Sequence, residues 1–211
     1  RALGLPDIDQ QKVGEDGLFT STFVEGQKFS RVVYIGVGEQ AKVDVEKVRK
    51  LGGKVVKYLQ MNQLKQAIVV SCFSLLSGSS KVNEAEVASA FTEGFFLGMY
   101  TFERYKTDEE MKKKKRIVSL VYVSEQGSGI SELQTALETS KTICVHTNFV
   151  RDLVNLPANI ATPTYLTQLA SKVAKASGLK CTILGRRELV KEKMGCFLSV
   201  AQGSAEEPQL V

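Results

Sequence analysis

The stretch RDLVNLPANIATPTYLTQLA, residues 151–170, decides the fold because it joins two helices. It begins inside a helix that the apolar pattern predicts over residues 128–156. Pro157 ends that helix, because a proline disfavours helical backbone in the residue before it. Thr162 then offers an N-cap hydroxyl, and Pro163 takes the favoured first position of a new helix. We therefore expect a long linking helix, a second helix after it, and a turn that fixes the angle between the two.

Upstream of this joint the sequence alternates between strand and helix patterns. The order is β-β-α-β-α-β, which is typical of an α/β sheet with right-handed crossovers. Two of the strands are nearly continuous apolar runs and are expected to be parallel and buried. The predicted strands are 18–24, 31–37, 66–73 and 117–123, and the predicted helices are 42–60 and 83–104. We expect one self-contained domain over residues 1–127.

Glycines mark a close contact between these helices. Gly52 and Gly53 lie in the middle of the first helix, where each costs about 1 kcal/mol relative to alanine. Gly94 and Gly98 lie one turn apart on the second helix and leave a groove for a neighbouring backbone. We expect another element to pack closely at both places.

Downstream of the joint the pattern continues as the beginning of a second α/β domain, residues 157–211. The helix that starts at Pro163 should end at Gly178. A strand (LKCTILG, 179–185), a short helix (186–194) and a further apolar stretch (196–204) come next. Residues 128–156 form the linker helix between the two domains, with Ser131 and Gln134 as a candidate capping box.

Composition places the chain among ordinary globular proteins, with 211 residues, 43% hydrophobic, 24% charged and a formal net charge of +5. It has core material enough to exclude disorder. No apolar run approaches the roughly 18–20 residues of a membrane span, and the N-terminus has no signal-peptide pattern. Because the chain does not start with Met, we expect it to begin inside a longer protein.

The four cysteines indicate a reducing compartment. None belongs to a CxxC pair, and a single histidine cannot complete a zinc finger. Cys72 and Cys144 fall in apolar segments, where a free thiol behaves as a small hydrophobic group. We therefore interpret both as reduced core residues of a cytoplasmic protein.

Candidates for catalytic chemistry are few. His146 is the only histidine, and on the linking helix it is expected to be a packing or surface residue. Gly36-Val37-Gly38 lacks the third glycine of a dinucleotide fingerprint. The basic run KKKKR, residues 112–116, can attract phosphate, but no aromatic residues accompany it and a solvated loop is expected. After the joint, the acidic residues are four glutamates with surface patterns: Glu188, Glu192, Glu206 and Glu207.

The chain resembles the leucyl (cytosol) aminopeptidases, peptidase family M17. The strongest resemblance is the 151–170 stretch, which is similar to the beginning of the family's catalytic domain. Three further stretches agree in order and extend the resemblance over about residues 18–211. They are VVYIGVGE with VEKVRKLGGKVVKYL (32–39 and 45–59), EGFFLGMYTFERYK (93–106), and MGCFLSVAQGSAEEPQLV (194–211), which resembles the strand and glycine turn just before the family's metal site.

The resemblance implies a hexameric cytoplasmic aminopeptidase that removes N-terminal, preferably apolar, residues from peptides. It also implies a macrodomain-like N-terminal domain and two divalent ions, Mn or Zn, that activate a water and polarise the peptide carbonyl. The family's ligands lie in FDSGG-type and NTDAEGR-type motifs, which this sequence lacks. They belong after the VAQGS segment, beyond Val211. We therefore expect no catalytic, cofactor-binding or metal-binding residue in this chain, and no activity from the 211 residues alone.

An alternative from another class is a macrodomain-like binding module. One version binds a nucleotide such as ADP-ribose, for which Gly36-Val37-Gly38 is too short a pattern. The other version binds nucleic acid, which only the basic charge favours. A mobility-shift assay across a salt series would distinguish this module from the peptidase.

Overall fold

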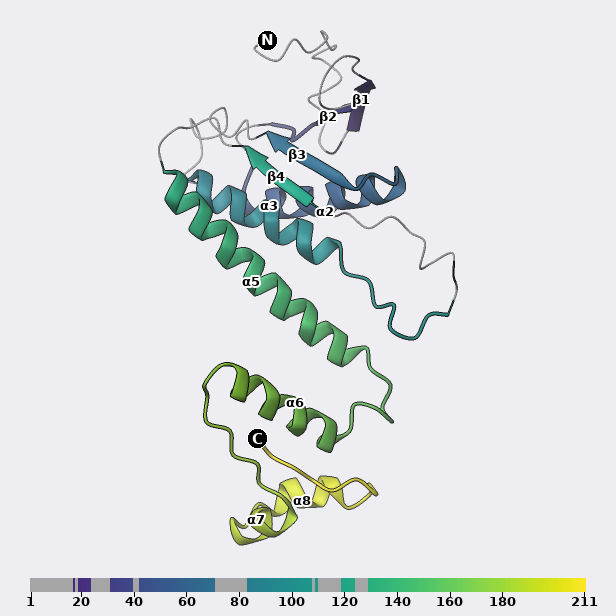
Figure 1. Ribbon diagram of the computed structural model, residues 1–211, viewed down its shortest axis with the longest axis vertical. Coiled ribbons are helices and arrows are strands. Elements are labelled where there is room, and N and C mark those ends of the chain that lie inside the picture. Colours follow the sequence, from purple (N-terminus) through teal and green to yellow (C-terminus); the bar gives the residue numbers. More distant parts are fainter. Residues whose placement is uncertain are drawn as a thin grey trace. The chain divides into compact units, whose positions relative to one another are not determined.

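The structure of the chain is a computed structural model, drawn in Figure 1. It describes residues 17, 19–23, 31–39, 42–70, 83–107, 109, 119–123 and 129–211. The chain divides into two compact units, Arg1–Phe149 and Val150–Val211.

The first unit has the predicted alternation of strands and helices. Its described elements succeed one another as β-β-α-β-α-β and then a long helix, whose last turn extends into the second unit. They are β1 Phe19–Phe23, β2 Arg31–Ile35, α2 Val45–Met61, β3 Gln66–Val70, α3 Glu84–Gly98, β4 Ser119–Val123 and α5 Ile130–Val154. The order of elements predicted from the sequence is thus confirmed.

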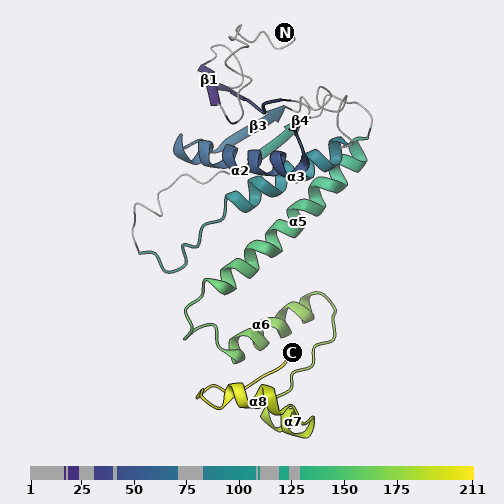
Figure 2. The same ribbon diagram turned by 180° about the vertical axis from the view of Figure 1, so that it is seen from behind.

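The described strands form two separate pairs, whereas a single sheet was expected. β1 and β2 are antiparallel, and β3 and β4 are parallel as predicted. Figures 1 and 2 show α2 and α3 on the same side of the β3–β4 pair. Ala67 and Val69 point to this side and pack against the helical core. Ile68, on the opposite side, is 61% exposed, so the prediction that this strand is buried on both faces was wrong for the described structure.

The core of the first unit is the contact between α2 and α3, and glycines set its closeness. A Cβ on Gly52 would lie 2.3 Å from the carbonyl oxygen of Phe91, and one on Gly94 would lie 1.8 Å from that of Arg49. Both helices therefore touch backbone to backbone, as predicted. Around this contact lie the buried side chains of Val48, Val55, Val56, Leu59, Val87, Ala90, Phe91 and Phe95.

The helix ends in the first unit agree partly with the sequence patterns. α3 begins with a capping box in which Asn83 and Glu86 exchange side-chain and backbone hydrogen bonds. It ends at Gly98 rather than near residue 104, in keeping with the low helix propensity of glycine. α5 begins at Ile130, one residue before Ser131, so the predicted capping box is wrong. Gln134 instead donates a hydrogen bond to Glu138, at 3.1 Å.

The helix predicted to follow the joint is present in the second unit. α6, Pro163–Ala176, has Thr162 as its N-cap, and the Thr162 hydroxyl accepts a hydrogen bond from the backbone N–H of Tyr165 at 3.2 Å. Gly178 comes after the helix with φ +66°, and Leu179 N–H donates to Ala174 carbonyl at 2.8 Å. This is a Schellman ending. Two short helices complete the unit, α7 Arg186–Lys191, as predicted, and α8 Gly195–Ala201.

Two strand predictions in this unit were wrong. Residues 179–185 form no strand, and their only bridge in the described chain joins Leu184 to Leu210 through hydrogen bonds of 2.8 and 3.0 Å. The apolar stretch 196–204, for which a strand and glycine turn were expected, begins as α8. Both outcomes have one cause: a strand needs a neighbour to satisfy its backbone groups, whereas a helix satisfies its own.

Some predictions concern residues outside the described structure. These are the basic run 112–116 and Cys72. Among the described helices, none combines the length and the apolar character that crossing a membrane requires.

Candidate functional site

An open groove of about 860 Å³ lies in the described part of the first unit, beside the N-terminal parts of α2, α3 and α5. Its ionisable lining residues are Arg49, Glu86, Glu93 and Glu132, so acidic groups outnumber basic ones. The other lining side chains are small or uncharged and include the hydroxyls of Ser89, Ser131 and Thr135. The lining contains no histidine, and the Thr135 hydroxyl donates a hydrogen bond to the carbonyl oxygen of Ser131 at 2.9 Å.

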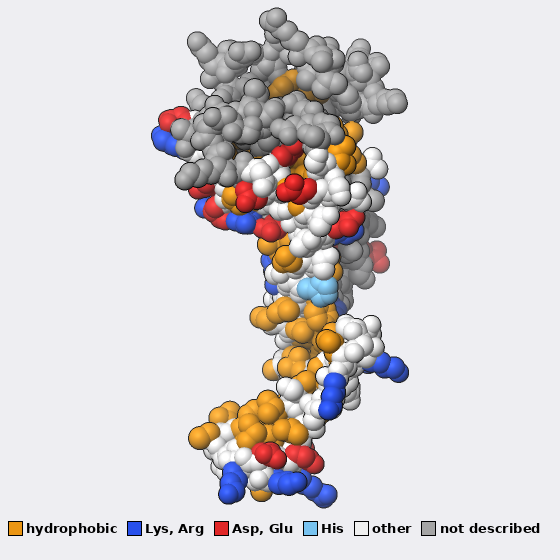
Figure 3. Space-filling view, turned by 90° about the vertical axis from the view of Figure 1, so that its left-hand side faces the viewer, with side chains coloured by type: hydrophobic (Ala, Val, Ile, Leu, Met, Phe, Trp, Pro, Cys, Tyr) orange, Lys and Arg blue, Asp and Glu red, His pale blue; other side chains and the backbone are white. Residues whose placement is uncertain are grey.

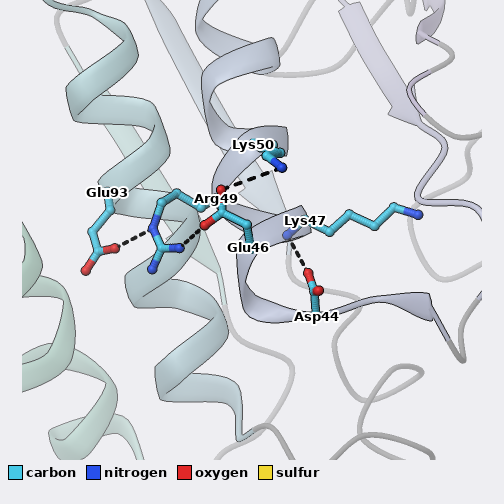
Figure 4. Close-up of polar contacts among 6 residues, drawn as sticks. All are labelled: Asp44, Glu46, Lys47, Arg49, Lys50 and Glu93. Carbon is cyan, nitrogen blue, oxygen red and sulfur yellow. Dashed lines mark hydrogen bonds and ion pairs between the residues drawn. The ribbon is translucent and has the colours of Figure 1, made fainter.

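The charged centre of this groove is Arg49, which bridges two helices (Figure 4). Its Nε donates to Glu93 Oε2 on α3 at 2.8 Å, and its Nη1 donates to Glu46 one turn earlier on α2. The Nζ atom of Lys50 also lies 3.8 Å from Oε1 of Glu46. The hydrogen bond that Arg49 donates to Glu93 raises the pKa of Arg49; burial opposes this rise, and Glu46 adds to it. Two carboxylates thus meet two cations, Arg49 and Lys50, and we interpret this cluster as a link between α2 and α3.

The thiol of Cys144, on α5, is buried next to Glu93 of the same cluster. Its side chain is 1% exposed, and Sγ is 3.9 Å from the carbonyl oxygen of Glu93. Burial raises the pKa of Cys144, Glu93 raises it further, and Arg49 lowers it in part. A thiol with a raised pKa stays protonated near neutral pH and is a poor nucleophile. The prediction that Cys144 lies in the core is confirmed, and its thiol forms no disulfide.

The single histidine lies on the surface, as expected. His146 is exposed on α5, and Nδ1 is 2.8 Å from the carbonyl oxygen of Thr142, one turn earlier on the same helix. Figure 3 shows this imidazole in pale blue on the molecular surface. The contact of the imidazole with Thr142 is therefore local to its own helix.

The acidic residues of the second unit lie on the surface, and two of them have local structural roles. Glu188 accepts a hydrogen bond from Gly185 N–H at 3.0 Å at the start of α7, and Glu207 pairs with Arg186 at 2.9 Å. Glu192 and Glu206 are exposed. Across the residues that the structure describes, no three His, Cys, Asp or Glu side chains gather closely enough to hold a metal ion.

A second, smaller groove of about 310 Å³ lies in the second unit, beside α8. Its wall is mainly apolar, with Pro163, Phe197, Val200 and Pro208 among the lining residues. Gln209, at its edge, donates to Thr164 Oγ1 at 3.1 Å and also contacts the Thr167 hydroxyl. These bonds hold residue 209 against α6. The groove can accept an apolar group, and the Ser204 hydroxyl in its lining accepts a hydrogen bond from the backbone N–H of Glu206 at 3.1 Å.

Sequence patterns missed both the capping box and the ion-pair cluster. The capping box has a readable signature, because Asn83 and Glu86 have the required spacing. The pairing of Arg49 with Glu46 is also readable from the i, i+3 spacing on a helix. The pairing of Arg49 with Glu93 cannot be read from the sequence, because it depends on how α2 and α3 are aligned.

Sequence models of one known protein family match two parts of this chain. A sequence model of the cytosol aminopeptidase family, N-terminal domain, matches residues 13–109, and a model of the same family's catalytic domain matches residues 148–211. The two matches succeed each other in chain order. The chain belongs to the cytosol aminopeptidase family.

Individual relatives agree with this assignment. A "Probable cytosol aminopeptidase" of Solibacter usitatus is 34% identical over 186 residues, which cover 88% of this chain and 36% of the relative. Another of Persephonella marina is 31% identical over 206 residues, covering 96% and 40% respectively. The chain therefore spans roughly two fifths or less of the length of these relatives.

Solved structures share the fold. A mutant of tomato leucine aminopeptidase superimposes with a TM-score of 0.75 at 25% identity and covers 93% of this chain and 37% of its own. The bottromycin maturation enzyme BotP superimposes with a TM-score of 0.77 at 20% identity, covering 98% and 42%.

Proposed function

We propose that this chain is part of a metal-dependent leucyl aminopeptidase that removes N-terminal, preferably apolar, residues from peptides. The observation that carries the proposal is the ordered match to both domain models of one peptidase family. The likeness to tomato leucine aminopeptidase supports the preference for an apolar first residue. A cytoplasmic homo-hexamer is proposed on the family resemblance alone.

We further propose that the enzyme uses two divalent ions, Mn or Zn, bound by residues outside this chain. The structure of BotP in complex with Mn supports the use of a divalent ion. The described residues do not fit such a site, because no three potential ligands of the usual kinds converge among them. The acids of the second unit with identified contacts serve a helix start and an ion pair.

The test compares two purified proteins on a leucyl-amide substrate, with Mn or Zn added. One is the 211-residue chain with its mass verified, and the other is the same chain extended past Val211 through the rest of a catalytic domain. We expect release of leucine by the extended chain only, and its loss when a chelator is added. Metal-dependent turnover by the 211-residue chain would contradict the proposed location of the metal site. A folded, metal-loaded extended chain without activity would contradict the peptidase assignment.

A second candidate function is binding of a nucleic-acid backbone by the first unit. One observation favours it: Lys50, Lys54 and Lys57 are exposed and succeed one another at steps of four and three on α2. Residues at this spacing lie on one helix face. Such a row can neutralise successive phosphates.

Salt dependence tests this candidate. We would replace these three lysines with glutamine and compare duplex DNA binding with a control variant of equal charge, in which Lys172, Lys175 and Lys180 on the second unit are replaced. If the α2 row contacts phosphates, the slope of log K against log salt falls by about 0.9 per lost contact, or about 2.7 in all, in the α2 variant only. Equal losses in both variants, or no retardation at about 50 mM salt, would reject this function.

A further inference from the structure

We draw no further inference here: the strongest candidate, the exposed apolar face that Ile68 of β3 and Val121 and Val123 of β4 form on the two-stranded parallel sheet, carries nothing because nothing in the described structure shows what covers it.

Discussion

Replacing Gly94 with alanine should destabilise the first unit, because the new methyl group has no room. Its Cβ would lie 1.8 Å from the carbonyl oxygen of Arg49 and 2.7 Å from the carbonyl carbon. A carbon–oxygen contact needs about 3.3 Å, so α2 and α3 would have to separate by about 1.5 Å. The atoms that meet are backbone atoms of two helices, and no side-chain rotation can relieve the clash.

The magnitude results from two opposing effects. Alanine is the better helix former, which stabilises α3 by about 1 kcal/mol. Against this, a gap of about 0.5–1 Å already forfeits a quarter to a half of each dispersion contact, and overpacked cores lose about 1–3 kcal/mol or more. Because the required shift is larger and affects the main core contact of the unit, we expect a net loss of at least about 2 kcal/mol in the free energy of unfolding.

Gly53→Ala is the matched control. It adds the same methyl group to the same pair of helices, but its Cβ would meet only the carbonyl oxygen of Gly94, at 3.7 Å, which is an ordinary contact. This variant should be more stable than the wild type by up to about 1 kcal/mol. Urea titrations followed by circular dichroism would measure both variants. If Gly94→Ala were as stable as Gly53→Ala, the close backbone contact between α2 and α3 would be refuted.

Two further predictions concern other parts of the chain. In the native protein, a thiol reagent at pH 8 should label exposed Cys196 quickly and buried Cys144 only after unfolding, because Cys144 is 1% exposed and has a raised pKa. Comparable labelling rates of the two thiols in single-cysteine variants would contradict the burial of Cys144. Thr162→Ala should destabilise the second unit by about 1 kcal/mol through loss of the α6 N-cap, whereas Thr162→Ser should retain most of the stability; a urea titration in which both variants behave alike would show that the cap is unimportant.

Local signals in the sequence predicted the parts of the fold that depend on neighbouring residues. The start of α6 is set by Thr162 and Pro163, and its end is set by Gly178. The close contact of α2 and α3 was predictable because Gly52 and Gly94 each weaken a helix and therefore need a compensating role. The family was predictable for a related reason, since the 151–170 joint combines several such signals at fixed spacing.

Features that depend on distant parts of the chain were not predictable in the same way. The segment 179–185 has the composition of a strand, but a strand exists only where another segment pairs with it, and here only Leu184 has such a bridge. The separation of the four described strands into two pairs likewise depends on which segments hydrogen-bond to one another. Glu93 became the partner of Arg49 through the alignment of two helices, which no spacing within one helix reveals.

The difference between local signals and contacts with distant residues also explains why this chain can be assigned to a peptidase family without a catalytic residue being named. A carboxylate that binds a metal must turn its oxygens toward the ion and away from competing local partners. In the described chain, Glu86, Glu188 and Glu207 direct oxygens to helix starts or to an arginine, and Glu93 to Arg49. These acids stabilise helix ends and helix contacts. The family assignment thus rests on matches over residues 13–109 and 148–211, within which the acids named above contact local structural partners.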